Sequence, residues 1–369
     1  MQTTALALAH EKLGAMMVPF AGWKMPLHYG SQLEEHRTVR QSAGVFDVSH
    51  MVIVDLKGSD AKTFCQTLFA NDVAKLKPGR ALYTTMLTEA GGIIDDLIVY
   101  QLGANEYRII TNAGTRDKDL NWINTQLKTL DLSVQLFVQE DLALLAVQGP
   151  AVLESCHLWL PEAFTTQVKA LKPFHCLQTN NMFVSTTGYT GETGFEIALP
   201  NANVQDLWDK IIASGVKPIG LGARDSLRLE AGLNLYGADM DEGVTPDESN
   251  LSWTVDLSDT SRVFIGREAI EANRVKPHSC LMGAVLEQKG TLKAGLTVFL
   301  NDRPIGTITS AAWSPLLSRA IAMVRVNEPA EQAIVQLRGK PASISLHPLP
   351  FYKNAKVVVT THKEGENHV

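Results

Sequence analysis

The residue pattern of the chain changes at Cys280, and this change limits the folds that its 369 residues can adopt. From Cys280 onward, short runs of β-branched residues alternate with turn signals, as in GLTVFLNDRPIGTITS and AIVQLRGKPASISLHPLP. Such runs are typical of strands joined by tight turns. We therefore expect residues 280–369 to form a separate all-β domain of about 85–90 residues, either a small barrel or a sandwich.

The part of the chain before this change mixes helical and strand-like patterns. The first helical pattern is SDAKTFCQTLFA at residues 59–70, which begins with Ser59, a suitable N-cap. A second helical pattern covers residues 115–127. Short apolar runs typical of strands lie between them, at residues 81–86, 93–100 and 107–110. This alternation predicts a compact α+β unit over residues 51–139.

Charge and motif content argue against several classes of protein. The net charge is −6 and the Lys and Arg residues are scattered singly, so we expect no nucleic-acid partner. The four cysteines form no C-x-x-C pair and the histidines do not cluster at ligand spacing, so we expect no metal. No phosphate-binding loop occurs, and IGLGAR at residues 219–224 lacks the third glycine of a dinucleotide fingerprint. We expect no bound nucleotide and interpret that segment as a tight turn into a helix.

The chain also lacks the usual signs of a membrane protein. No stretch approaches about 18 uncharged apolar residues, and no basic region precedes the short apolar stretch near the amino terminus. We therefore expect a cytoplasmic protein with no membrane partner, or a protein of the mitochondrial matrix if the sequence is a processed eukaryotic form.

Residues 91–100, GGIIDDLIVY, place two carboxylates, Asp95 and Asp96, inside a strand-like apolar run. Aspartate is depleted from strands and costly to bury without a partner. Neighbouring strand residues face opposite ways, so one acid can point into a pocket while the other meets a loop or a donor. An apolar setting raises the pKa of the more buried acid, which makes it a candidate proton acceptor. In an equally weighted structural alternative, one Asp caps the turn after Gly91 and Gly92 and the other forms a salt bridge.

Residues 187–196, TGYTGETGFE, combine three regularly spaced glycines with Tyr189 and Glu196. The glycines would let the backbone approach a flat ligand closely, and Tyr189 could stack on it. Glu196 could accept two parallel hydrogen bonds from an amino-pyrimidine edge. Taken alone, however, the segment fits better a glycine-rich hairpin with a solvated Glu196.

Residues 221–232, LGARDSLRLEAG, place Arg224 and Arg228 four residues apart, on one face if the segment is a helix. Asp225 is suited to cap the start of that helix. One arginine could bind a ligand carboxylate. Equally, both arginines could form structural ion pairs with Asp225 and Glu230.

Several motifs, taken as a set, resemble the aminomethyltransferase family, the T-proteins of the glycine cleavage system. The motifs are GWKMPLHYGS at 22–31, GVFDVSHM at 44–51, ANDVAKL at 70–76, GGIIDDLIVY at 91–100, TGYTGETGFEIALP at 187–200, GLGARDSLRLEAGLNLYGADMDE at 220–242 and PLPFYK at 348–353. The resemblance implies an α+β protein with three domains in a cloverleaf-like arrangement around a folate channel. The implied domains are residues 1–50 together with 140–275, residues 51–139, which carry the catalytic Asp, and a β-barrel at 280–369.

The resemblance also implies roles for individual residues. The family's principal catalytic carboxylate matches Asp96, with Asp95 as its structural partner, and the residue that holds the pterin edge matches Glu196. The remaining folate-pocket residues implied are Asn112, Tyr189 and Arg224, with Met51, Tyr83, Tyr236 and Trp253 as walls. From the residues alone, Tyr236 and Trp253 fit ordinary packing better than a pocket wall.

The implied reaction passes the methylene carbon of an aminomethyl group on the lipoyl arm of H-protein to tetrahydrofolate, the co-substrate. Two related branches remain as alternatives. One is the folate-binding relative that assists iron–sulfur protein maturation, whose Lys-Gly-Cys motif is not found here. The other is the folate domain of dimethylglycine or sarcosine dehydrogenases, which comes with a flavin-binding region that this chain does not contain.

The chain departs from the family pattern in two places. Residues 308–322, ITSAAWSPLLSRAIA, replace a more glycine-rich stretch, which could alter a turn near the channel mouth. Lys353 stands where the family often has arginine. Lysine keeps the charge and loses the planar fork that binds a carboxylate through two hydrogen bonds.

Overall fold

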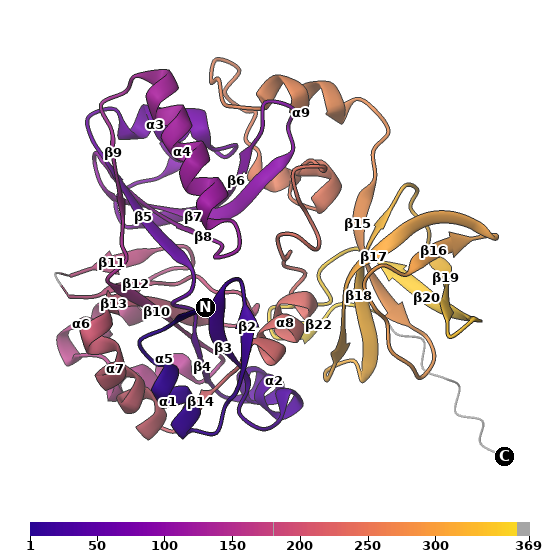
Figure 1. The fold of residues 1–369 in the computed structure, drawn as a ribbon, viewed down its shortest axis with the longest axis horizontal. Coiled ribbons are helices and arrows are strands. Elements are labelled where there is room, and N and C mark those ends of the chain that lie inside the picture. The colour runs from indigo at the N-terminus through magenta and orange to yellow at the C-terminus, as the bar shows by residue number, and fades with distance from the viewer. Residues whose placement is uncertain (180, 360–369) are drawn as a thin grey trace.

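Two α+β units and a C-terminal β-barrel make up the molecule (Figure 1), a computed structural model that describes residues 1–179 and 181–359. The first unit contains a six-stranded sheet in the order β11-β12-β13-β10-β4-β14. Its strands are β4 (Gly44–Asp47), β10 (Leu142–Gln148), β11 (Cys176–Gln178), β12 (Phe183–Ser185), β13 (Gly194–Pro200) and β14 (Lys217–Pro218). A smaller sheet at the amino terminus contains β1 (Gln2–Thr3), β2 (Met16–Phe20) and β3 (Trp23–His28). The helices of this unit are α1 (Ala7–Lys12), α2 (Gln32–Gln41), α5 (Val152–Ser155), α6 (Glu162–Lys169), α7 (Asn201–Ala213) and α8 (Leu221–Glu230), with the 3₁₀ turn η2 (Cys156–Leu158).

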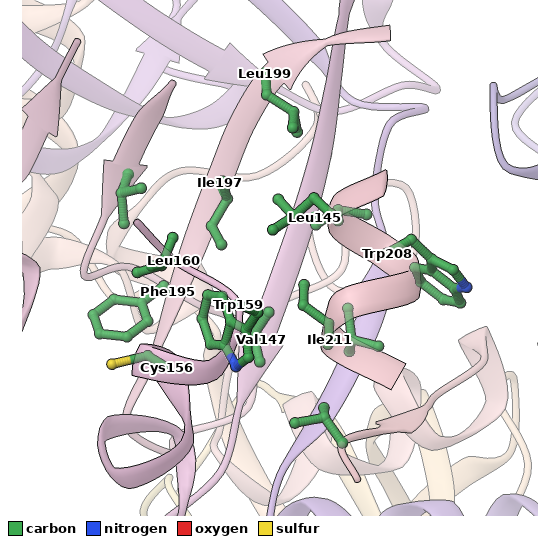
Figure 2. Close-up of a cluster of buried hydrophobic side chains, with 14 of the residues drawn as sticks. Leu145, Val147, Cys156, Trp159, Leu160, Phe195, Ile197, Leu199, Trp208 and Ile211 are labelled. Atoms are coloured by element: carbon green, nitrogen blue, oxygen red, sulfur yellow. The ribbon is translucent and has the colours of Figure 1, made fainter. Parts of the chain in front are cut away.

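Strand β10 is buried on both faces, and its alternating side chains enter two different cores. Leu145 and Val147 point to one face, where they pack with Ile197 of β13 and Trp208 of α7 (Figure 2). The intervening residues belong to the core on the opposite face, described below. This explains why the strand is apolar from Leu142 to Val147, as is typical of strands buried on both faces.

The second unit is a five-stranded antiparallel sheet in the order β6-β7-β8-β5-β9, with helices α3 and α4 packed on it. Its elements are β5 (Val52–Lys57), α3 (Ala61–Leu68), η1 (Val73–Lys75), β6 (Arg80–Leu87), β7 (Ile93–Gly103), β8 (Glu106–Thr111), α4 (Arg116–Leu130) and β9 (Gln135–Val138). The helices and strands expected in this region are therefore confirmed.

The expected cap at Ser59 is wrong. Helix α3 begins at Ala61 with Asp60 in the N-cap position, and no side chain caps it. Asp60 instead accepts a hydrogen bond from the backbone N–H of Ser133, at 2.9 Å. Gly58, at φ +153°, lies so close to Ser133 that a Cβ there would be 2.0 Å from its carbonyl oxygen. This contact between distant segments, which helix propensity does not capture, sets where the chain enters the helix.

The two units share one hydrophobic core. Leu144 and Ala146 of β10 and Phe46 of β4 pack against Ile53 of β5 and Tyr100 of β7. The two sheets therefore meet face to face along an apolar seam. The side chains of β7 that lie on the same face as Tyr100 point to this seam. Those on the opposite face point to α3 and α4.

A connecting segment follows α8 and contains the short elements η3 (Asp247–Ser249), η4 (Ser252–Thr254) and α9 (Arg267–Arg274). Part of it packs on the second unit, because Leu251 and Ile270 lie in one core cluster with Leu87 of β6 and Ile93 of β7. The proposed division of the chain into residues 1–50 with 140–275, 51–139 and 280–369 stays a prediction.

The C-terminal part is a closed antiparallel barrel in the strand order β15-β18-β17-β16-β19-β20. Its strands are β15 (Cys280–Leu286), β16 (Thr297–Leu300), β17 (Arg303–Ser314), β18 (Arg319–Val326), β19 (Gln332–Leu337) and β20 (Lys340–His347), followed by the hairpin β21 (Tyr352–Lys353) and β22 (Lys356–Val357). The expectation of an all-β terminal domain is confirmed, and it is a barrel rather than a sandwich. Residues 360–369 of the expected domain lie outside the described residues.

Buried charges hold the barrel against α8. Arg228 of α8 donates to Asp239 at 2.6 Å and to Ser310 of β17 at 3.0 Å. Glu230, two residues further on, pairs with Arg40 of α2 at 3.0 Å and accepts from Ser314 of β17 at 2.5 Å. Helix α8 therefore joins the first unit to the barrel through charged groups rather than through apolar contact alone. Among the described residues, no helix combines the length and the apolar character needed to span a bilayer.

Candidate active site

The acid pair lies on β7, where neighbouring residues face opposite sides of the sheet. Asp96 pairs in register with Thr85 of β6 and points, like Tyr100, to the seam between the two units; it is half-buried. Asp95 is fully buried and points to the helical side, where Leu97 and Val99 enter the second unit's core. The sheet thus gives two adjacent carboxylates two different surroundings, as the sequence predicts.

Two side chains hold the Asp96 carboxylate. Tyr83 of β6 donates its hydroxyl to Oδ2 at 2.5 Å, and Asn112 donates its amide to Oδ1 at 3.0 Å. The pKa of Asp96 is raised to about 7, first because the protein removes its water and then because of the charge of Asp95, while the two hydrogen bonds oppose the shift. Asp96 can therefore take up or release a proton near neutral pH, which suits a general acid or base.

Asn112 also binds the neighbouring acid. Its side-chain amide donates to Asp95 Oδ1 at 2.9 Å, and its backbone N–H donates to Asp95 Oδ2 at 3.2 Å. Thr115 donates its hydroxyl to the same Oδ2 at 3.0 Å. Asp95 thus caps the loop before α4, whereas the sequence alternative placed a capping Asp at the turn after Gly91 and Gly92. Neither Asp95 nor Asp96 forms a salt bridge among the described residues.

Two of the expected walls lie beside Asp96. Tyr83 stacks on Trp253 of η4, with ring centroids 5.3 Å apart and planes inclined by 24°. Trp253 is 61% exposed and covers the tyrosine from the solvent side. Burial and the charge of Asp96 keep the pKa of Tyr83 well above its ordinary value, so its hydroxyl keeps its proton and remains a donor.

Tyr236 stands next to Asp95 rather than next to Asp96. Its hydroxyl donates to the backbone oxygen of Ile93 at 2.9 Å, and the ammonium of Lys118 contacts the same hydroxyl. The Lys118 ammonium also lies 4.3 Å from the centre of the Tyr236 ring and 3.0 Å from Glu242. Tyr236 therefore anchors the connecting segment to the beginning of β7.

A second group of expected residues lies across the seam. The guanidinium of Arg224 lies 4.3 Å from the centre of the Tyr189 ring, and its Nη2 is 3.9 Å from the sulfur of Met51. The Tyr189 hydroxyl donates to the backbone oxygen of Asn234. Burial raises the pKa of Tyr189, and the charge of Asp96 adds to that rise.

Glu196 of β13 belongs to this second group. It is 9% exposed and accepts a hydrogen bond from Thr187 at 2.5 Å. Burial raises its pKa, while Thr187 and the positive charge of Arg224 lower it. Tyr100, on the same face of β7 as Asp96, contacts Thr187 through its hydroxyl at 2.9 Å. A hydrogen-bonded chain therefore links β7 to Glu196, and the alternative of a solvated Glu196 is wrong.

The glycines before Glu196 have a different use from the one expected. A Cβ at Gly188 would meet Gln148 of β10 at 2.1 Å, and one at Gly194 would meet the carbonyl oxygen of Val147 at 2.3 Å. Whatever ligand is bound, a side chain at Gly194 would collide with the backbone of β10, and one at Gly188 would have to displace the side-chain amide of Gln148. The close approach that they permit is to the protein's own strand.

The two arginines of α8 have separate roles. Helix α8 begins after Gly220, and Asp225 lies inside it, so Asp225 is not the cap that was expected. A turn into a helix at this segment is confirmed. Arg228 is buried in ion pairs with Asp225 and Asp239, whereas Arg224 faces Tyr189. The structural ion pair is confirmed for Arg228 with Asp225, whereas Glu230 pairs with Arg40 instead; ligand binding by Arg224 stays a prediction.

A cavity of about 590 Å³ adjoins the second group. Its lining includes Phe20, Leu33, Tyr189, Arg224, Leu235 and Trp313. Asp96 and Glu196 are not among its lining residues, so Tyr189 and Arg224 connect the cavity to the acids. Trp313 belongs to the stretch 308–322 that departs from the family pattern, and this stretch therefore forms part of the cavity wall.

Several polar groups near the site were not expected from the sequence. His50 is buried, and burial together with the charge of Arg224 lowers its pKa to about 4, so it is neutral near pH 7. Asp119 of α4 is buried behind Asp95. Helical spacing could have found Asp119, which is four residues before the buried Ile123. Among the described residues, no three His, Cys, Asp or Glu side chains are grouped so that they could hold a metal ion.

Together the fold and the site define a class of protein with two α+β units, a C-terminal barrel and a proton-exchanging carboxylate at the seam between the units. Residues 6–259 match the family model described as the GCVT N-terminal domain. Residues 280–353 match the model of the glycine cleavage T-protein C-terminal barrel domain. The chain belongs to the aminomethyltransferase family of glycine cleavage T-proteins.

A solved structure agrees with this assignment. Glycine cleavage system aminomethyltransferase T from Bartonella henselae is 35% identical, with a TM-score of 0.89 over 95% of this chain and 98% of that chain. The heterotetrameric sarcosine oxidase from Corynebacterium sp. U-96 is 12% identical and covers 57% of this chain and 93% of that chain. Its TM-score is 0.35.

Proposed function

We propose that this chain transfers the methylene carbon of an aminomethyl group, carried on the lipoyl arm of H-protein, to tetrahydrofolate. The products are 5,10-methylenetetrahydrofolate, ammonia and the reduced lipoyl arm. The observation that carries this proposal is Asp96, whose carboxylate has a pKa of about 7 and is held by Tyr83 and Asn112. The 35% identity to the Bartonella henselae aminomethyltransferase over 95% of the chain supports it.

The reaction is redox-neutral and moves two protons. Two bonds of the carbon break, one to the lipoyl sulfur and one to the amino nitrogen, and two bonds to folate nitrogens form. The folate nitrogens lose two protons, the leaving nitrogen takes up one to become ammonia, and the sulfur takes up the other. The carbon passes through an iminium-like state, so a carboxylate beside it stabilises positive charge and can relay protons.

The residues around Asp96 fit these two tasks. Tyr83 and Asn112 fix both carboxylate oxygens, so the charge is already in place when the cation develops and little reorganisation is needed. The stacked Tyr83 and Trp253 rings shield the acid from water. Exclusion of water strengthens the attraction between the carboxylate and the cationic carbon.

The second group of residues fits a folate. Glu196, buried near the positive charge of Arg224, can accept hydrogen bonds from the amino-pyrimidine edge of the pterin. The Tyr189 and Arg224 pair offers a flat surface for stacking, and the adjoining cavity of about 590 Å³ has room for the remainder of the molecule. Met51 lies beside Arg224, and Asn112 binds Asp96. No metal is part of the proposed step.

The function is tested by coupled turnover. We expect the purified chain to form methylenetetrahydrofolate and ammonia when it receives both tetrahydrofolate and aminomethyl-loaded H-protein, and to do so far more slowly with H-protein that lacks the lipoyl group. Ammonia release and the folate product are measured together in stopped samples. Folate binding without turnover in the presence of loaded H-protein would instead favour a folate-binding protein without transfer chemistry.

Glu196→Gln is expected to weaken tetrahydrofolate binding about 10- to 100-fold, because one of the two carboxyl oxygens that accept from the pterin edge is replaced by an amide group that donates. Isothermal titration measures the dissociation constant directly. The matched control is Glu162→Gln, which changes an exposed glutamate at the start of α6 in the same unit. An unchanged dissociation constant in Glu196→Gln would remove Glu196 from the proposed folate site.

A further inference from the structure

Three buried hydroxyl groups lie between β7 and Glu196. Tyr100 of β7 and Ser185 of β12 are fully buried, and Thr187, which follows β12, is 6% exposed. The Tyr100 hydroxyl lies 2.9 Å from that of Thr187 and 3.3 Å from that of Ser185. The hydroxyls of Ser185 and Thr187 are 2.7 Å apart. The three groups therefore form one hydrogen-bonded cluster across the seam between the two units.

The hydrogen bonds of this cluster run toward Glu196. A hydroxyl group has one proton to donate and two lone pairs that accept. Thr187 donates its proton to Glu196 Oε2 at 2.5 Å, and Ser185 lies 3.5 Å from the backbone oxygen of Glu196. Because the one proton of Thr187 is directed to Glu196, the contact between Tyr100 and Thr187 is a hydrogen bond only if Tyr100 donates. Tyr100 is therefore a donor to Thr187, which in turn donates to the carboxylate.

The bond from Thr187 fixes the Glu196 carboxylate and leaves room for a ligand on it. A carboxylate has about four lone-pair sites, and Thr187 occupies one of them on Oε2. Among the described residues, none donates to Oε1. Two parallel hydrogen bonds from a flat ligand can therefore still reach both oxygens. The Thr187 bond also opposes the rise that burial causes in the pKa of Glu196, so it favours the accepting carboxylate over the acid.

Packing fixes the Tyr100 ring independently of its hydroxyl. The ring meets Phe183 of β12 edge-on, with centroids 5.0 Å apart and planes at 90°, and lies in the shared core with Phe46 and Ile53. The position of the hydroxyl therefore follows strand β7. The same face of β7 carries Asp96, four residues away, or about 13 Å at the usual rise of a strand. The hydroxyl cluster thus connects Glu196 to the strand that holds the acid.

We propose that Tyr100 is a positioning residue for folate binding, which acts through Thr187 to hold the Glu196 carboxylate in place for the pterin edge. This inference rests on the proposed function, because it takes Glu196 as the acceptor for the pterin. A glutamate side chain loses conformational freedom when it binds a ligand, and an acceptor that is already fixed loses less. The hydroxyl cluster therefore makes folate affinity depend on a strand of the second unit, although Glu196 belongs to the first.

Tyr100→Phe tests the proposal because it keeps the ring and removes only the hydroxyl. We expect the dissociation constant of tetrahydrofolate to rise about 3- to 10-fold, the effect of one lost hydrogen bond. We expect kcat at saturating tetrahydrofolate to change by less than about twofold, because the partners of Asp96 are untouched. Isothermal titration and steady-state kinetics measure the two quantities. A Tyr100→Phe chain that is less stable but binds tetrahydrofolate as the native chain does would show a merely structural residue and overturn the proposal.

The matched control is Tyr107→Phe. Tyr107 of β8 is also fully buried, but it lies in the core that faces α3 and α4, and its hydroxyl has no partner among the described residues. Tyr107→Phe therefore removes a buried tyrosine hydroxyl from the same sheet without touching the cluster, and the dissociation constant of tetrahydrofolate should not change. An equal rise in Tyr107→Phe and Tyr100→Phe would overturn the proposal.

Variants of Thr187 test the route of the effect. Thr187→Val removes the donor to Glu196 and should raise the dissociation constant at least about 10-fold, whereas Thr187→Ser keeps the hydroxyl and should recover most of that loss. In a Thr187→Val background, adding Tyr100→Phe should cause no further loss, because the link to Glu196 is already broken. Circular dichroism checks that the double variant is folded. Losses that simply multiply in the double variant would mean that Tyr100 acts independently of Thr187, which overturns the proposal.

The positioning role and the proposed function fail in different ways. If Glu196→Gln weakens tetrahydrofolate binding and Tyr100→Phe does not, the positioning role is overturned and the folate site stands. If Tyr100→Phe and Thr187→Val both weaken binding but the native chain transfers no carbon from loaded H-protein, the positioning role is supported and the transfer reaction is refuted instead.

Discussion

Asp96→Asn is expected to lower kcat for methylene transfer by about 10³-fold while leaving tetrahydrofolate affinity nearly unchanged. The amide has the same shape and can still accept the Tyr83 hydroxyl, which lies 2.5 Å from the carboxylate in the native chain. It can neither carry the negative charge that faces the iminium-like carbon nor exchange a proton near neutral pH. Single-turnover measurements with loaded H-protein isolate this step from product release.

A matched substitution elsewhere in the same unit separates loss of chemistry from general damage. Asp131, at the C-terminal end of α4, is exposed and adopts a left-handed backbone conformation at φ 49° that Asn tolerates well. Asp131→Asn should therefore retain full turnover. If Asp96→Asn also retained full turnover, the carboxylate would have no essential part in the reaction.

Arg228→Met is expected to lower the free energy of unfolding by about 3–5 kcal/mol, because it leaves the buried carboxylate of Asp239 without its cation. The native guanidinium binds Asp239 at 2.6 Å and Ser310 of the barrel at 3.0 Å. Its remaining partner, Asp225, is half-exposed and contributes little. Urea unfolding followed by fluorescence and circular dichroism measures the loss.

The control for this prediction is a basic residue whose ion pair with an aspartate is exposed to solvent. Lys210 of α7 forms an ion pair with Asp206 one helical turn away, and both side chains are mainly exposed. Lys210→Met should change the stability by no more than the error of the measurement. Equal losses in the two variants would mean that the charge network between α8 and the barrel does not depend on burial.

Sequence patterns predicted the elements of the second unit and the barrel because those elements are determined by local periodicity. The acid pair was also visible, since Asp95 and Asp96 interrupt an apolar strand and a strand reverses the direction of adjacent side chains. Local pattern alone left their roles undecided. The burial of Asp95 and the Tyr83 hydroxyl on Asp96 resolve the two environments, and both depend on neighbouring strands and helices.

Non-local contacts explain what the sequence could not predict. Arg224 and Arg228 lie one turn apart on the same helix, and the sequence pattern does not separate their roles. Only the packing of the barrel and of Asp239 distinguishes them. The glycines at 188 and 194 suggested a ligand because the sequence does not show that β10 lies against them. The spacing between Asp119 and Ile123 places Asp119 on the buried side of α4, but its position behind Asp95 depends on how that helix packs on the sheet.

The core shared by the two α+β units affects how this architecture could have been assembled in evolution. Phe46 and Leu144 on one side and Ile53 and Tyr100 on the other would all be exposed if either unit were separated from its neighbour. Neither unit is therefore suited to exist as an independent module. The barrel, with its own closed sheet and apolar centre, is attached through charged side chains on α8 and through a small apolar cluster around Leu229 of the same helix. Gene fusion and domain exchange are consequently easiest at the junction near Cys280 and hardest across the seam that holds the acid.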